Sequence, residues 1–461
     1  MNDDSIQTIV ASSRVAQAAY EANGSQARYD RAAQAVAWAI MEPARNRELA
    51  ELAVATTGLG NVPDKITKNH RKTLGLMRDI QNARTFGVVS DDASTGITEI
   101  ARAKGVVGAI VPSTNPAATP ANNIINALKC GNSIIVAPSP KGVASAERLL
   151  GFIHAEFAKI GEDRNLVQMV PAPGSKEKTQ TLMELCDMIV ATGSQNNVHR
   201  AQTAGTPAVA VGAGNVAVIV DETADLAAAA EKIRASKCFD NATSCSSENS
   251  VVVVDAIYDA FVVAMAKAGG ELVDDEAGIV AKLWPGGHLN REVIAQDADK
   301  MIAALDLDVP AGTEYIAVPT SGIGPDHPLS GEKLSRVLAL YRASDFDEAV
   351  QIARDIQLHQ GAGHSVGLHS TNTVRPMILA NAIPTSRVIV NQAHTFATGG
   401  SFTNGMPFSL SMGCGTWGGN SVNDNVNYRN FLQSTKIVRE IPANEPALED
   451  IFGTYWEETG K

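Results

Sequence analysis

Residues 106–138 are VVGAIVPSTNPAATPANNIINALKCGNSIIVAP, in which two short apolar stretches flank a segment with helical spacing of apolar residues. The first stretch is expected to be a strand that ends at Pro112, and AATPANNIINALKCG, residues 117–131, is expected to be a helix. Apolar strands separated by helices of this length are typical of parallel strands that are buried on both faces. This stretch therefore predicts a doubly wound α/β sheet.

The same alternation continues toward the C-terminus. The further expected elements are a strand at 133–138, a helix at 142–161, a strand at 166–171, a helix at 177–186, a strand at 188–193, a helix at 197–205 and a strand at 207–212. Such a sheet binds ligands beyond the carboxyl ends of its strands. The segments PSTN, APSPKG and TGSQ follow three of the expected strands, so they are predicted to lie at one rim.

A second α/β block is predicted after Lys237, with strands at SVVVVD, RVLALYRA, SVGLHS and RVIVN and a helix at AIYDAFVVAMAKAGG. Before the first block, residues 10–22 and 29–58 have helical periodicity that stops at Gly58. Alternation from Ile97 predicts a hairpin that leads into the first buried strand. Residues 391–430 are rich in Gly, Asn and Ser and are expected to be a long loop.

Composition and charge argue against several classes of partner. A chain of 461 residues suggests two or three units, and its net charge is −12 with no basic run, which is unlike a nucleic-acid-binding protein. No apolar stretch reaches the roughly 20 residues that span a bilayer. Asp3 and Asp4 stand where a signal peptide would carry positive charge. We therefore expect a cytoplasmic protein with neither a nucleic-acid nor a membrane partner.

The cysteines indicate neither a disulfide framework nor a metal site, because they form no CxxC pair and no cluster with histidine. Cys245 differs from the others in lying in a small polar loop, CFDNATSCSSEN, between an expected helix and a strand of four valines. A thiolate in such a loop can attack a carbonyl carbon. From the residues alone, a buried structural thiol is the commoner assignment.

Seven motifs, in order along the chain, resemble those of the acylating aldehyde dehydrogenases. They are VPSTNPAATP, IIVAPSPKG, PAVAVGAGNVAVIVD, SKCFDNATSCSSENSVVV, GEKLSRVLALYRASDFDEAV, GAGHSVGLHS and SLSMGCGTWGGNS. The resemblance covers about residue 5 to about residue 450, and the cysteine segment and GCGTWGGNS are specific. Within this branch the chain looks most like the sulfoacetaldehyde dehydrogenases, while acetaldehyde or succinate semialdehyde would suit the predicted site almost as well.

The resemblance implies an aldehyde dehydrogenase-like α/β fold of two doubly wound, Rossmann-like domains with a small oligomerisation extension. The dinucleotide-binding domain is expected over residues 1–235 together with about 425–450. The catalytic domain, which carries the nucleophilic cysteine, is expected over 236–424. Residues 97–110 and 451–461 are candidate oligomerisation segments, and a homodimer or homotetramer is expected.

Three residues match catalytic positions of the family. Cys245 stands where the family keeps its nucleophile. Asn115 stands where an amide holds the aldehyde oxygen together with the Cys245 N–H, although a turn residue before Pro116 would also be asparagine. His364 is similar to a histidine of the acylating branch, where it would assist transfer to coenzyme A or line the pocket; a hydrogen-bonded structural histidine is an equal alternative.

The resemblance also implies a nicotinamide cofactor, NADP or NAD. Glu332 matches a glutamate that contacts the nicotinamide ribose, and Lys141 is placed to pair with a 2′-phosphate, which favours NADP. Gly212 opens GAGNVA, a relaxed dinucleotide fingerprint that runs on into a strand instead of a helix. The candidate cofactor-binding residues are Pro112, Ser113, Ser139, Lys141, Thr192, Gly193, Ser194, Gly212 and Glu332.

An aldehyde oxidised on Cys245 would become a thioester, and an absent side chain predicts which acceptor takes the acyl group from it. Hydrolytic family members keep a glutamate in the motif ELGG, and the corresponding stretch here, residues 211–215, is VGAGN, which offers no base to water. We therefore expect transfer to coenzyme A, giving an acyl-CoA from a small aldehyde, with sulfoacetaldehyde as the preferred substrate. A hydrolytic aldehyde dehydrogenase and a non-catalytic protein of the same fold are the alternatives. The loop 394–406 is expected to line the pocket for the aldehyde.

Overall fold

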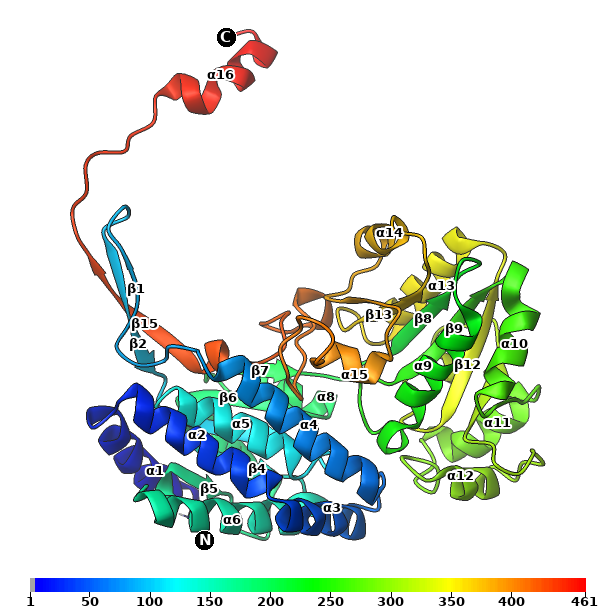
Figure 1. Cartoon of the computed structure of the whole chain (residues 1–461), viewed down its shortest axis with the longest axis horizontal. Coiled ribbons are helices and arrows are strands. Elements are labelled where there is room, and N and C mark those ends of the chain that lie inside the picture. The colour runs from blue at the N-terminus through cyan, green and yellow to red at the C-terminus, as the bar shows by residue number, and fades with distance from the viewer. Residues whose placement is uncertain (1–4) are drawn as a thin grey trace.

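The computed structural model describes residues 5–461 as two parallel sheets with their helices and a projecting arm (Figure 1). Asp3 and Asp4, on which the expectation about a signal peptide rests, lie outside the described residues. The first sheet has the strand order β5-β4-β3-β6-β7 and is parallel throughout. Its strands are β3 (Val106–Val111), β4 (Ser133–Pro138), β5 (Val167–Met169), β6 (Met188–Thr192) and β7 (Ala208–Val211).

Helices cover both faces of this sheet. They are α1 (Ser5–Ala22), α2 (Gln26–Met41), α3 (Pro43–Thr57), α4 (Val62–Ile80), α5 (Ala118–Lys129), α6 (Val143–Ile160), α7 (Lys176–Leu185) and α8 (Gln195–Thr203). Val107 and Ala109 of β3 pack with α2, α5 and α6, whereas Val106 and Ile110 pack with α1, α7 and α8. This alternation is the period of two that a strand buried on both faces requires. Helix α3 ends at Gly58, whose φ of 71° provides a left-handed cap.

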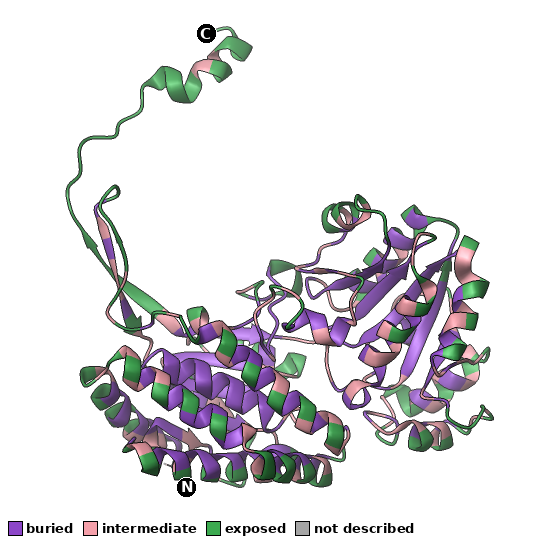
Figure 2. Cartoon of the chain, in the orientation of Figure 1, coloured by how far each residue is buried: buried purple, intermediate pink, exposed green. Residues whose placement is uncertain are grey.

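The second sheet is parallel too, with the order β10-β11-β12-β9-β8-β13-β14. Its strands are β8 (Val216–Val220), β9 (Glu248–Val254), β10 (Gly270–Leu272), β11 (Tyr315–Pro319), β12 (Val337–Ala343), β13 (Val366–His369) and β14 (Val388–Val390). Its helices are α9 (Leu226–Cys238), α10 (Tyr258–Lys267), α11 (Glu276–Leu283), α12 (Ala298–Ala304), α13 (Phe346–His359), α14 (Arg375–Ala382) and α15 (His394–Thr398). Figure 2 shows the strands of both sheets buried beneath these helices. The prediction of two doubly wound α/β domains is confirmed.

The chain leaves the first sheet earlier than expected. Strand β8 pairs with β9 and β13 of the second sheet, so the strands divide between Val211 and Val216 and not at residue 235. The physical reason is the short connection. A parallel neighbour in the same sheet needs a crossover of about a dozen residues or more, and the four residues after Val211 cannot provide one.

A three-stranded antiparallel arm projects from the first domain. It consists of β1 (Val88–Asp92), β2 (Ile97–Ala103) and β15 (Leu432–Val438), in the order β1-β2-β15, and is followed by the exposed helix α16 (Leu448–Thr459). The candidate oligomerisation segment 97–110 is therefore split, because residues 106–110 belong to the buried strand β3. The segment 425–450 supplies β15 to the arm and adds no strand to the five-stranded sheet. None of the helices within residues 5–461 has the length and apolar character needed to cross a membrane.

Candidate active site

A cavity of about 390 Å³ lies between the two sheets and gathers most of the predicted site. Both Asn115, after β3, and Cys245, before β9, line it. Eight of the candidate cofactor-binding residues line the same cavity: Pro112, Ser113, Ser139, Thr192, Gly193, Ser194, Gly212 and Glu332. His364 is fully buried behind Cys245, and Lys141 lies outside the cavity.

The turn before Cys245 has an unusual backbone. Asp240, Asn241 and Ala242 all have positive φ, of 48°, 55° and 60°. Non-glycine residues adopt this region at a cost, so the surroundings must hold them there. Asp64 accepts a hydrogen bond of 2.8 Å from the Asp240 N–H, and Arg336 donates to the Asn241 side chain at 2.7 Å. The loop that carries Cys245 is therefore fixed by contacts with both domains.

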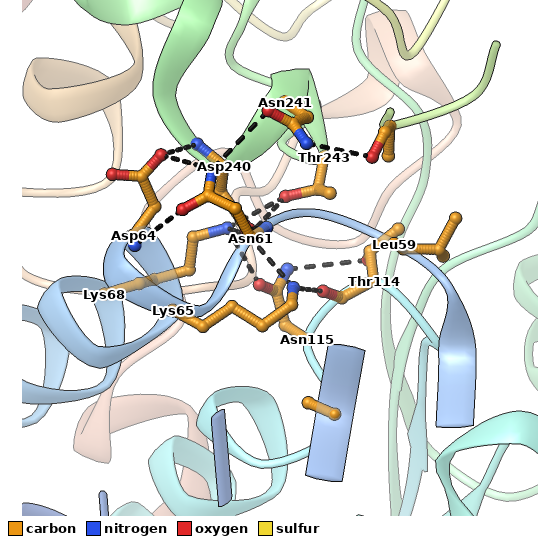
Figure 3. A network of polar contacts seen from close by, with 12 residues as sticks. Leu59, Asn61, Asp64, Lys65, Lys68, Thr114, Asn115, Asp240, Asn241 and Thr243 are labelled. Atoms are coloured by element: carbon orange, nitrogen blue, oxygen red, sulfur yellow. Dashed lines mark hydrogen bonds and ion pairs between the residues drawn. The ribbon is translucent and has the colours of Figure 1, made fainter. Parts of the chain in front are cut away.

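A buried polar network connects α4 to this loop (Figure 3). Lys65 and Lys68, one turn apart on α4, both form ion pairs with Asp240, which is fully buried. Thr243 also donates to the Asp240 carboxylate, at 2.7 Å. The two lysines hold the pKa of Asp240 below its usual value despite burial, so the carboxylate is charged. A carboxylate with this many donors can be kept in a buried position.

Lys68 also orients Asn115. Its ammonium donates to Oδ1 of Asn115 at 3.0 Å and to Oγ1 of Thr243 at 2.9 Å (Figure 3). Because Oδ1 accepts this bond, the orientation of the amide is fixed and Nδ2 remains a donor. Among residues 5–461, Nδ2 of Asn115 makes one hydrogen bond, a long one of 3.5 Å to Oγ1 of Thr114. An amide donor held in this way suits a developing oxyanion.

Cys245 is the first member of a hydrogen-bonded chain of side chains. Nε2 of His364 lies 3.3 Å from its Sγ, and Nδ1 of His364 lies 2.8 Å from Oγ of Ser365. The same hydroxyl lies 2.8 Å from Nε2 of His394. Arg387 donates to the backbone oxygen of His364 at 2.9 Å and so fixes the loop that carries the imidazole.

Burial governs the protonation of Cys245 and His364. It raises the pKa of the Cys245 thiol to about 12, with the Glu332 carboxylate adding to the rise and Arg387 and Lys72 opposing it. Burial, helped by the Arg387 charge, lowers the pKa of His364 to about 3. In the free protein the pair is therefore a thiol beside a neutral imidazole, and a neutral imidazole has a lone pair for the thiol proton.

The part of the cavity toward the first sheet suits a dinucleotide. Thr192, Gly193 and Ser194 end β6 and precede α8, whose N-terminus faces the cavity. The hydroxyls of Ser139 and Thr119 line the cavity, are buried and have no hydrogen-bond partner among residues 5–461. Unpartnered buried hydroxyls of this kind are ready to bind a polar ligand.

Glu332 lines the cavity together with Cys245, whereas Lys141 does not. Burial raises the pKa of Glu332 to about 7. The Glu332 carboxylate is also close enough to Cys245 to raise the pKa of its thiol. Lys141 lines an adjoining, more open hollow of about 870 Å³, which it shares with Arg291 and Lys300. Ser113 lines both spaces, so the hollow that contains Lys141 adjoins the cavity on the side of the predicted dinucleotide region, and Cys245 does not line that hollow.

Three cationic side chains of the cavity were not predicted. Lys68, Arg71 and Lys72 of α4 line it together with Cys245. Their spacing of i, i+3 and i+4 places them on one face of a helix, which is the signal that the sequence offers. The signal is weak because such a face is usually solvated, and only the fold shows that this one is turned inward.

The family model for the "Aldehyde dehydrogenase family" matches residues 2–277, and the chain belongs to this family. A sulfoacetaldehyde dehydrogenase (acylating) from Cupriavidus necator is 55% identical, over 99% of this chain and 94% of that protein.

Solved structures agree with this assignment. An acetylating aldehyde dehydrogenase from Geobacillus thermoglucosidasius has a TM-score of 0.92 at 28% identity, over 97% of this chain and 100% of that one. A Rhodopseudomonas palustris propionaldehyde dehydrogenase, solved with bound CoA and an acylated cysteine, has a TM-score of 0.85 at 25% identity, over 94% and 97%. The prediction of an acylating aldehyde dehydrogenase, an oxidoreductase, is confirmed.

Proposed function

We propose that this protein oxidises sulfoacetaldehyde to sulfoacetyl-CoA, with coenzyme A as the acyl acceptor and NADP as the oxidant. The full-length similarity to an acylating sulfoacetaldehyde dehydrogenase supports the substrate. The acylated cysteine and bound CoA of the propionaldehyde dehydrogenase support the thioester and its acceptor. Lys141, Arg291 and Lys300, which line one hollow, support a cofactor or co-substrate with an additional phosphate.

One observation carries the acylating reaction, namely how Gly214 lies against the nucleophile. A Cβ on Gly214 would be 2.2 Å from the backbone oxygen of Cys245 and 2.9 Å from Cδ2 of His364. The stretch 211–215, which bears the base in hydrolytic relatives, therefore packs against the Cys245 backbone and the His364 ring and carries no carboxylate. The thioester has a histidine beside it and no base on this side for water.

The first half of the reaction uses the Cys245–His364 pair. The Sγ of Cys245 forms a bond to the aldehyde carbon while its proton passes to Nε2 of His364, and the aldehyde oxygen becomes an oxyanion. Nδ2 of Asn115 and the Cys245 N–H are the donors for that oxygen. When bound, the nicotinamide supplies the acceptor for the hydride that leaves this carbon. The Cys245 thioester results, and His364 releases its proton to solvent.

The second half of the reaction regenerates the Cys245 thiol. His364 takes the proton of the CoA thiol as its sulfur bonds to the thioester carbon. The C–S bond to Cys245 then breaks, and the departing thiolate regains the proton from His364. Over both halves one aldehyde and one CoA thiol give one acyl-CoA. One hydride, which carries the two electrons of the oxidation, passes to NADP, and one proton is released.

The reaction is tested with purified protein, sulfoacetaldehyde, NADP or NAD, and CoA present or omitted. We expect reduced nicotinamide to accumulate beyond one equivalent per subunit only with CoA, and mass spectrometry to find sulfoacetyl-CoA. Sustained turnover at the same rate without CoA, giving the free acid, would contradict the proposal. Replacing Lys141 with Ala is expected to lower the preference for NADP over NAD, with little change in kcat.

The arm and α16 are proposed to pair subunits into a homodimer or homotetramer, since β1 is an edge strand and α16 exposes Leu448, Ile451, Phe452 and Tyr455. Light scattering of the full chain and of a chain ending at residue 440 tests this. A cytoplasmic location belongs to the same proposal, and cell fractionation tests it.

A further inference from the structure

Two cations of α4 have no acidic partner. Among residues 5–461, Arg71 and Lys72 form no ion pair, whereas Lys65 and Lys68 share Asp240 and the more distant Arg78 pairs with Asp79. Lys72 is buried, and Arg71 is partly buried. A charge taken out of water without a counter-ion is costly, so an unpaired pair of cations in one cavity indicates that an anion occupies the space beside them.

Backbone oxygens hold both side chains in place and leave donors free. Lys72 donates to the oxygens of Gly399 and Ser409, the latter at 3.0 Å, and an ammonium has three N–H groups. Nη2 of Arg71 donates to the oxygens of Phe396, at 2.8 Å, and Gly400, at 3.3 Å. Nε and Nη1 of Arg71 have no partner among residues 5–461.

Both cations share the cavity with the Cys245 thiol. Each lines it together with Cys245, Thr395 and Phe396. The Lys72 charge lowers the pKa of the Cys245 thiol, so the two groups are within electrostatic reach of each other. Burial lowers the pKa of Lys72 itself to about 7, with the Arg71 charge adding to the effect, as expected for a cation without a counter-ion.

The aromatic rings beside Arg71 limit the space. Its guanidinium lies 5.0 Å from the ring centre of Phe396 and 5.4 Å from that of Phe408. These rings fix the guanidinium plane and leave its free edge for a planar or tetrahedral oxyanion. A substrate that reacts at Cys245 and reaches Arg71 must fit both its aldehyde and its anionic group into this one cavity of about 390 Å³.

We infer that Arg71 and Lys72 are the specificity-determining residues, which bind the terminal sulfonate or carboxylate of a short aldehyde and select it over an uncharged one. This inference rests on the proposed function, because it assigns the substrate tail of the same site. Lys68 has a different task, since Asp240, Thr243 and Asn115 occupy its three donors.

The test compares Arg71→Gln and Lys72→Met with wild type on sulfoacetaldehyde, succinate semialdehyde and acetaldehyde. We expect kcat/KM for the two anionic aldehydes to fall at least tenfold in both variants. For acetaldehyde it should stay within threefold in Arg71→Gln and fall less than the anionic values in Lys72→Met, since Lys72 also lowers the pKa of the Cys245 thiol. Turnover of acetaldehyde also shows that each variant folds. Arg78→Gln is the matched control, because Arg78 is on the same helix and near the Phe408 ring but does not line the cavity. It should leave all three values unchanged.

A binding measurement separates this inference from the reaction itself. Isethionate, an unreactive two-carbon sulfonate, should bind wild type in calorimetry and slow iodoacetamide labelling of Cys245, and both effects should weaken at least tenfold in the two variants. Equal losses for charged and uncharged aldehydes would overturn the inference, as would a rise in KM for NADP or CoA with isethionate binding intact. If no aldehyde yields acyl-CoA yet isethionate binds through Arg71 and Lys72, the proposed function fails and the anion site stands. If acetaldehyde is converted to its acyl-CoA as efficiently as the anionic aldehydes, the acylating reaction stands and the anion site fails.

Discussion

Nε2 of His364 lies 3.3 Å from Sγ of Cys245, and the imidazole reaches this position from the second sheet, where β13 begins two residues later. Neither group is charged in the free protein, because burial raises the pKa of the thiol and lowers that of the imidazole. The pair therefore differs from a preformed thiolate–imidazolium ion pair, and the thiol is activated only as it loses its proton to His364.

The assignment of the nucleophile predicts different results for two cysteines. Cys245→Ala should reduce NADPH formation to background while leaving cofactor binding, measured by fluorescence, unchanged. Cys238→Ala should keep most of the activity, because Cys238 is buried among the apolar residues that pack on α9, and its Sγ donates to the backbone oxygen of Glu314 at 3.9 Å. An acyl group found by mass spectrometry on any residue other than Cys245 would contradict the assignment.

His364→Ala should lower kcat about 10²- to 10⁴-fold, the range for loss of a positioned acid–base group. Because His364 acts in both halves of the proposed reaction, the first-turnover burst of NADPH and the steady-state rate should both slow. Stopped-flow absorbance measures the two phases. A burst with wild-type rate followed by slow turnover would restrict His364 to the transfer to CoA.

The pH dependence of Cys245 labelling follows from the direction of its pKa shift. Only the thiolate reacts with iodoacetamide, and the thiol pKa is raised to about 12, so the labelling rate should rise about tenfold per pH unit from pH 7 to 10. His364, with its pKa lowered to about 3, stays neutral throughout and adds no inflection near pH 6.5. A plateau already present at pH 6 would indicate a preformed ion pair and contradict this description. Cys245→Ala gives the background from the buried thiols.

Lys68→Met should lower kcat by releasing the amide of Asn115 from its fixed orientation. Asn115→Ala removes an oxyanion donor and should cost about 10²- to 10³-fold in kcat. Lys68→Met should cost less, since the donor remains. The double variant should be no slower than Asn115→Ala alone, because Lys68 acts through Asn115. Additive losses would instead assign Lys68 a role through the stability of the Cys245 loop.

Gly75→Ala should destabilise the protein, although alanine favours a helix over glycine. A Cβ on Gly75 would lie 2.3 Å from Cγ of Phe408, which is fully buried, so the ring or α4 must move. Overpacking of this kind costs about 1–3 kcal/mol. Gly151→Ala in α6, where a Cβ meets no atom within 4 Å, is the control and should keep or raise the unfolding midpoint. Differential scanning fluorimetry measures both.

Local patterns predicted the strands and helices because each apolar run is buried within its own element, as at β3, β4 and β9. The same patterns could not assign β8 to a sheet, since β7 and β8 are alike in composition and only the short connection between them distinguishes the two. Motif resemblance placed Asn115 and Cys245 in one site, and the structure brings both to one cavity.

The network of Lys65, Lys68 and Asp240 was not predicted, because its partners are more than 170 residues apart and no local signal pairs them. Arg71 and Lys72 escaped prediction for a related reason. A cationic helix face normally contacts water, and here it is the loop from Phe396 to Ser409 that covers it. Long-range placement of charge is the part that sequence patterns do not contain.

The ion pairs between α4 and Asp240 join halves of the chain that belong to different sheets. The amide of Asn115, the proposed oxyanion donor, belongs to one half, and the sulfur of Cys245, the proposed nucleophile, belongs to the other. During refolding, each half could regain its secondary structure well before any turnover returned. The delay between recovery of the circular dichroism signal and recovery of activity would then measure how long the two halves take to dock.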